Sequence, residues 1–137
     1  MRFTFNIEGG DFTHAGNGSS QIKKLLKQLN INPFLIKRTV VALYEAEMNV
    51  VAHAYKGVID VDIDSDKVFI RIQDEGPGIA DINQAMQEGF STASSRVREM
   101  GFGAGMGLPN IKKNADRLEI RSQVGVGTCL EITTFIK

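Results

Sequence analysis

The run VFIRIQDEGPGI at residues 68–79 is the part of the sequence that says most about the fold and the candidate site. Its first half alternates, so Val68, Ile70 and Ile72 share one face of a predicted strand. Asp74 continues that face where the pattern calls for another core residue, and two glycines follow within four residues. Because burying an unpartnered carboxylate is strongly unfavourable, Asp74 requires a hydrogen-bond donor. The run therefore predicts one end of a ligand pocket. The alternative is an aspartate that caps its own turn at a strand end.

The chain before this run predicts a strand, two helices and a second strand. They cover residues 2–7, 22–29, 33–55 and 59–63. The long helix has an Asn-Pro start at 32–33 and is apolar on most of its circumference, which is typical of a buried helix. The second strand alternates apolar residues with Asp60, Asp62 and Asp64, which gives it an acidic outer face.

The chain after the run predicts a short helix at 81–87, a long Gly- and Ser-rich loop over 88–107, and a further helix marked by Leu108, Ile111, Ala115 and Leu118. Two strands follow at 118–122 and 128–136. This order predicts an α+β fold, a two-layer α/β sandwich in which helices cover one side of a mixed sheet. At 137 residues, we expect one domain over 1–137.

Composition excludes several classes of function. Sixteen basic and sixteen acidic residues give zero formal net charge, and no basic stripe favours nucleic acid. The single cysteine, Cys129, forms no internal disulfide, and no Cys/His cluster predicts a zinc site. No signal peptide or long apolar run is present, so we expect a cytoplasmic protein without a membrane segment.

Polar residues on the long helix suggest chemistry. Glu45 and Asn49 lie four residues apart and share a face, and His53 continues the line. We expect His53 to make a hydrogen bond within the core or near Glu45 rather than to react. Glu47 lies two positions from both Glu45 and Asn49 and points elsewhere, so we expect it to be solvated or at an interface.

A glycine run at residues 103–107 precedes the last predicted helix. Such a run lets backbone amides approach a phosphate, and the helix adds its positive end. A flexible linker is the alternative. The run matches neither a P-loop nor the dinucleotide-binding spacing.

Taken in order, these segments resemble the GHKL family of ATPases and kinases, which share the Bergerat ATP-binding fold. The segment EAEMNVVAHAY at 45–55 resembles its N box, and DEGPGIAD at 74–81 resembles its first glycine box. The segments GFST at 89–92 and GAGMGLPN at 103–110 resemble its ATP lid and second glycine box, and GVGT at 125–128 its final box. Within the family, the chain is most similar to the anti-sigma-factor and stress-switch serine kinases of bacteria.

The resemblance implies a site for ATP and Mg²⁺. Glu45 would be the general base, Asn49 would hold Mg²⁺, and Asp74 would accept a hydrogen bond from the adenine amino group. Arg98 or Arg96 would reach the γ-phosphate. The other nucleotide-binding residues implied are Gly76, Gly78, Ile79, Ser91, Thr92, Gly103, Gly105, Met106, Gly107, Leu108 and Thr128.

The resemblance also implies an activity and partners. We expect an ATP-dependent serine/threonine protein kinase that phosphorylates a STAS-domain antagonist, binds a sigma factor and forms a homodimer. Two alternatives stay open: a nucleotide-dependent binding module without kinase activity, and a stand-alone histidine-kinase catalytic domain acting in trans. The chain carries no histidine-bearing dimerisation helices, which argues against a complete sensor histidine kinase.

Overall fold

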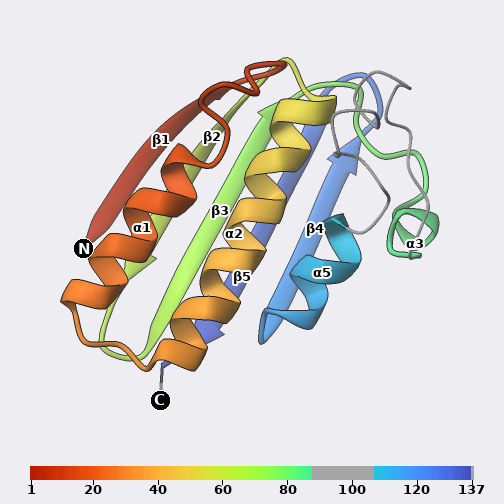
Figure 1. Cartoon of the computed structure of the whole chain (residues 1–137). Helices are drawn as coiled ribbons and strands as arrows, with labels where there is room; N and C mark the ends of the chain where they lie inside the picture. Colours follow the sequence, from red (N-terminus) through yellow and green to blue (C-terminus); the bar gives the residue numbers. More distant parts are fainter. Residues whose placement is uncertain (88–106, 137) are drawn as a thin grey trace.

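The computed structural model describes residues 1–87 and 107–136. Five strands form one sheet, and helices α1, α2 and α5 lie on one side of it (Figure 1). The strands are β1 (Arg2–Glu8), β2 (Lys56–Ile63), β3 (Lys67–Glu75), β4 (Arg117–Gln123) and β5 (Gly127–Phe135). The helices are α1 (Asn17–Gln28), α2 (Pro33–His53), α3 (Ile82–Ala85) and α5 (Gly107–Lys113). The predicted two-layer α/β sandwich is confirmed.

The sheet has the strand order β1-β2-β3-β5-β4. Every pairing in the described part of the chain is antiparallel, so the expectation of a mixed sheet was wrong. Strands β1 and β4 run in the same direction as β3, but β2 separates β1 from β3 and β5 separates β4 from β3. The sequence pattern predicts the strands but not which of them are neighbours.

Helix α2 lies at the centre of the helical layer, with α1 on one side and α5 on the other (Figure 1). Its N-cap forms as predicted, because the Asn32 side chain accepts a hydrogen bond from the Phe34 amide at 2.8 Å and Pro33 is the first helical residue. The core lies between α2 and the sheet, and its fully buried members include Leu43, Ile59 and Ile132. Helices α1 and α5 cover the two flanks of α2, as expected for a helix that is apolar on most of its circumference.

Several boundaries differ from the prediction: β2 begins at Lys56 and not at residue 59, and α3 is limited to Ile82–Ala85. Helix α1 begins at Asn17, earlier than the apolar spacing indicated, and takes in Gly18. Helix α5 ends at Lys113, and Leu118 belongs to β4. The Asp116 amide donates to the Thr133 carbonyl at 2.9 Å, so pairing with β5 has already replaced helical bonding there. In the described ranges, no helix has the length and apolar character needed to cross a bilayer.

Candidate active site

The side of α2 that faces α5 carries Glu45 and Asn49 one helical turn apart. The Asn110 side chain on α5 makes a hydrogen bond to the Glu45 carboxylate. The backbone of Gly107 passes so close to Asn49 that a Cβ added there would lie 2.8 Å from Asn49 Oδ1. The first turn of α5 therefore forms one wall with the two polar residues of α2, and a larger residue than glycine would displace the Asn49 amide.

Burial sets the protonation behaviour on this side of α2. It raises the pKa of Glu45 above its ordinary value, and the hydrogen bond from Asn110 opposes part of that rise. The pKa of His53, two turns further along, is lowered by burial. A carboxylate whose pKa is raised in this way accepts a proton more readily than a solvated glutamate.

Asp74 lies half-buried at the end of β3, as the alternation predicted. The donor that the sequence required is the Thr128 amide, which donates to Asp74 Oδ1 at 2.9 Å. Burial raises the pKa of Asp74, and this hydrogen bond opposes the rise. The Thr128 hydroxyl is paired with the Ser122 hydroxyl at 2.8 Å. The structure thus brings together two predicted site residues that are 54 positions apart.

The glycines of the turn after β3 pack against protein backbone. A Cβ on Gly76 would lie 3.0 Å from the Ala54 Cα, and one on Gly78 would lie 2.4 Å from the Gln123 carbonyl oxygen. Gly78 also has φ of +75°, which disfavours any other residue. The Ile79 amide donates to the Ser122 hydroxyl at 2.7 Å. These contacts seat the turn between the end of α2 and the β4–β5 turn.

The remaining predicted site residues divide into two groups. Gly107 and Leu108 begin α5, and the Leu108 side chain is buried. The others lie outside the described residues, and their roles stay predictions: Ser91, Thr92, Arg96, Arg98, Gly103, Gly105 and Met106.

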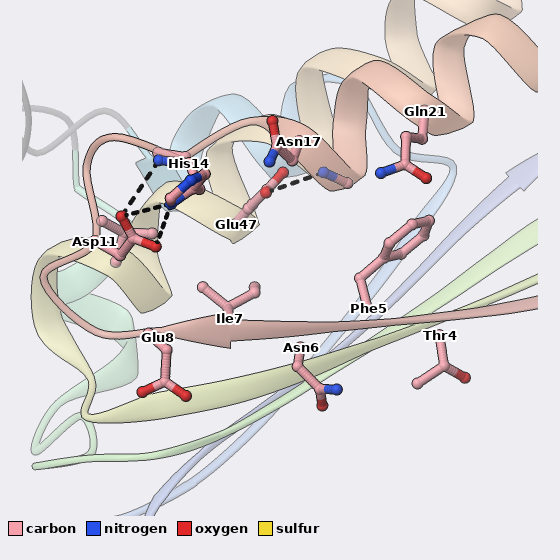
Figure 2. A pocket seen from close by; sticks show the side chains of 13 residues that line it. Thr4, Phe5, Asn6, Ile7, Glu8, Asp11, His14, Asn17, Gln21 and Glu47 are labelled. Atoms are coloured by element: carbon pink, nitrogen blue, oxygen red, sulfur yellow. Dashed lines mark hydrogen bonds and ion pairs between the residues drawn. The ribbon is translucent and has the colours of Figure 1, made fainter.

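Of the two alternatives expected for Glu47, the solvated one was wrong, because the side chain lies between α2 and α1. Its side chain is 3% exposed and faces α1. It accepts hydrogen bonds from the amides of Gly16, Gly18 and Ser19 at 3.1–3.2 Å, and from the Ser19 hydroxyl at 2.6 Å (Figure 2 shows its position). Helix α1 has Gly16 at its N-cap with no side-chain cap of its own, so a carboxylate from α2 supplies the missing acceptors.

Asn110 is the site residue that the sequence did not single out. It follows Gly107 by three positions and so lies on the same side of α5, toward α2. The three-residue spacing from Gly107, the last glycine of the run at 103–107, could have identified Asn110 as a site residue.

Comparison with known proteins adds a family to this geometry. The family model described as the histidine kinase-like ATPase domain matches residues 11–134. The chain belongs to the histidine kinase-like ATPase family. The match extends from the segment before α1 to β5, so it includes both flanks of α2 and the Asp74–Thr128 pair.

Two relatives of this chain are named as a serine/threonine-protein kinase and as an anti-sigma factor. The serine/threonine-protein kinase RsbT of Bacillus subtilis (strain 168) is 29% identical over 119 residues, which is 84% of each chain. An anti-sigma F factor of Thermoanaerobacter sp. (strain X514) is 37% identical over 100 residues, which is 69% of this chain and 66% of that protein. The predicted resemblance to anti-sigma-factor and stress-switch serine kinases is confirmed.

A solved structure shares the fold. The RsbU and RsbW domains of Rv1364c from Mycobacterium tuberculosis superpose with a TM-score of 0.63 at 16% identity. The superposition covers 96% of this chain and 32% of that one.

Proposed function

We propose that this chain is an ATP-dependent serine/threonine protein kinase that controls a sigma factor by phosphorylating a protein antagonist. The observation that carries the proposal is the half-buried Glu45 carboxylate. It lies one helical turn from Asn49 and accepts a hydrogen bond from the Asn110 side chain. This is a general base placed beside a polar residue suited to a phosphate-bound metal. The names of its relatives, a serine/threonine kinase and an anti-sigma factor, support the same activity.

The nucleotide would bind between α2 and the Asp74–Thr128 pair. Thr128 engages Asp74 Oδ1, and we propose that Oδ2 accepts a hydrogen bond from the adenine amino group. Phosphates would then extend toward Asn49 and the start of α5. Gly76, Gly78, Ile79 and Leu108 would shape the pocket around them, with the predicted lid residues completing it.

Mg²⁺ fits the polar groups on this side of α2. The described residues contain no cluster of three or more acidic, histidine or cysteine side chains that would hold a metal alone. Mg²⁺ characteristically takes one or two protein oxygens together with substrate phosphates and water. Asn49 Oδ1 would supply the protein ligand, and the bound metal would neutralise phosphate charge.

The chemical step needs a proton acceptor and little else from the protein. We propose that Glu45 takes the proton from a serine hydroxyl as the serine oxygen bonds to the γ-phosphorus. The bond between the γ-phosphorus and the bridging oxygen breaks, and ADP leaves. Asn110 would act as a positioning residue, since its hydrogen bond fixes the Glu45 carboxylate.

We propose that the acceptor serine lies on a STAS-domain protein and that the kinase works in the cytoplasm as a homodimer. Direct capture of the sigma factor would be the second action of the same chain. The name of the anti-sigma F relatives supports this second action.

Calorimetry with Mg-ATP tests the pocket. Wild type should bind, Asp74→Asn should weaken binding at least tenfold, and Asp62→Asn, which changes an exposed aspartate on β2, should bind as wild type. Absence of binding by folded wild type would refute the proposed nucleotide site.

Transfer from γ-labelled ATP to STAS-domain proteins of the same genome tests the kinase. Acid-stable phosphoserine is expected. An acid-labile phosphate would instead show a histidine kinase, and binding without any transfer would show a nucleotide-dependent binding module.

A further inference from the structure

The Ser122 hydroxyl lies at the end of the sheet where β3 finishes and β4 leads into β5 (Figure 1). Its oxygen accepts a hydrogen bond from the Ile79 amide at 2.7 Å. The same oxygen lies 3.1 Å from the Gly127 carbonyl oxygen and 2.8 Å from the Thr128 hydroxyl oxygen. Three segments of the candidate nucleotide site, the turn after β3, β4 and the start of β5, therefore meet on this one oxygen.

The single hydrogen of Ser122 fixes the direction of these bonds. A serine hydroxyl donates one hydrogen and accepts through two lone pairs. The Ile79 amide can only donate and the Gly127 carbonyl can only accept, so the Ser122 hydrogen points to Gly127. The second lone pair of Ser122 then accepts the Thr128 hydrogen. With the Ser122 hydrogen on Thr128 instead, two acceptor oxygens would face each other at 3.1 Å without a hydrogen between them.

This direction sets what Thr128 offers to a ligand. Because its hydrogen points to Ser122, the Thr128 hydroxyl keeps its lone pairs and has no hydrogen to donate. The Thr128 amide donates to Asp74 Oδ1 at 2.9 Å, so the hydroxyl and the carboxylate belong to residues in direct contact. Both side chains are acceptors. A pair of acceptors favours a base that donates there and disfavours one that presents a carbonyl oxygen.

We propose that Ser122 is a positioning residue that makes the pocket selective for a 6-amino purine over a 6-oxo purine. The inference rests on the proposed nucleotide site. Ser122 acts through Thr128, whose hydroxyl it holds as an acceptor beside Asp74. The 6-amino group of adenine donates to these acceptors. The 6-oxo group of hypoxanthine or guanine brings a further acceptor to the same position and leaves lone pairs facing each other.

A purely structural role for Ser122 is the competing explanation. The turn after β3 is already joined to the β4–β5 turn by two backbone hydrogen bonds. The Gly76 amide donates to the Val126 carbonyl at 3.1 Å, and the Gly125 amide donates to the Pro77 carbonyl at 2.9 Å. Neither bond uses the Ser122 hydroxyl. Loss of a structural contact would weaken binding of every purine nucleotide alike, whereas loss of the positioning role would change the ratio of their affinities.

Calorimetry with the magnesium complexes of ATP and inosine triphosphate tests the proposal on the folded full chain. Wild type should bind ATP about tenfold more tightly than inosine triphosphate, which carries the 6-oxo group. Ser122→Ala lets the Thr128 hydrogen turn toward the base. ATP binding should then weaken about fivefold, while binding of inosine triphosphate stays equal or improves. An equal loss for both nucleotides would overturn the positioning role and show a structural one.

Three further variants sharpen the test. Ser122→Thr keeps the hydroxyl and should retain the wild-type preference for ATP. Thr128→Val removes the oriented acceptor but keeps the shape of the side chain, so it should lower the preference as much as Ser122→Ala. Ser65→Ala removes an exposed hydroxyl from the β2–β3 turn, at the opposite end of β3 from Asp74, and should change neither affinity.

The double variant Ser122→Ala with Thr128→Val should lose no more preference than either single variant, because the two hydroxyls act as one unit. Additive losses would overturn the proposal. If Ser122→Ala does not fold, an unchanged preference in Thr128→Val would overturn it as well.

These outcomes separate the selectivity inference from the proposed function. Absence of ATP binding by folded wild type would refute the nucleotide site and the inference together. Equal binding of ATP and inosine triphosphate by wild type would overturn the selectivity inference alone and leave the nucleotide site in place.

Discussion

Glu45 and Glu47 lie two residues apart on α2, and the protein surrounds their carboxylates differently. Glu47 faces α1, is 3% exposed and accepts four hydrogen bonds from the N-cap and first turn of that helix. Glu45 faces α5 and is partly buried. Burial raises its pKa, and the hydrogen bond from the Asn110 side chain opposes that rise. The first carboxylate is compensated by the fold and stabilises it. The second bears a desolvation cost that favours taking up a proton.

The largest expected effect is on catalysis. Glu45→Gln keeps the size and the hydrogen-bonding capacity of the side chain but removes its ability to accept a proton. Phosphoryl transfer should fall by about 10²- to 10⁴-fold while Mg-ATP binding stays within about twofold of wild type. Single-turnover transfer and calorimetry measure the two quantities. Transfer at the wild-type rate would remove Glu45 from the role of base.

The next effect is on folding. Glu47→Ala should lower the free energy of unfolding by about 3 kcal/mol, because buried amides at the start of α1 lose their acceptor. Ser19→Ala removes one of the four donors and should cost about 1 kcal/mol. Urea unfolding measures both. Equal stability of wild type and Glu47→Ala would show that the carboxylate does not hold α1.

The pH profile should follow Glu45. Because burial raises the pKa of Glu45, transfer should be lost on acidification at a higher pH than a solvated glutamate would give. Asn110→Ala removes the hydrogen bond that opposes this rise, so its acid limb should move further toward neutral pH. Rates from pH 5 to 8, measured with saturating Mg-ATP, test the order. An unchanged limb in Asn110→Ala would exclude Asn110 as a positioning residue.

The smallest effect is a gain in stability. The folded-state pKa of Glu45 is raised, so ionisation of this group opposes folding, and its cost appears as the pH rises through that pKa. Glu45→Gln should therefore stabilise the nucleotide-free protein by about 0.5 kcal/mol at pH 7. The gain should vanish at acidic pH. A constant difference between pH 4 and 8 would exclude ionisation as its cause.

Local patterns predicted much of the fold. The alternation of Val68, Ile70 and Ile72 set the face on which Asp74 lies, because strand periodicity is a property of adjacent residues. The Asn32 cap was predictable for the same reason. Strand neighbours were not, since the position of β5 between β3 and β4 depends on contacts between distant segments.

The candidate site divides in the same way. Helical spacing placed Glu45 and Asn49 together, and it correctly sent Glu47 in another direction. It carried no information on what packs there, so the contact with α1 was missed. Thr128 was named as a site residue by the family resemblance and not by the spacing of the residues, and the structure brings its amide to Asp74.

The place of β5 in the sheet has a consequence for synthesis on the ribosome. Translation reaches β3 before β4 and β5, yet β3 and β4 meet only through β5, which is made after both. Until β5 emerges, β3 exposes an unpaired edge, and Asp74 lacks the Thr128 amide. The nascent chain can carry a complete α2 and still lack the Asp74–Thr128 contact on which the proposed adenine site depends. Cellular ATP would then stabilise only chains in which the sheet has closed.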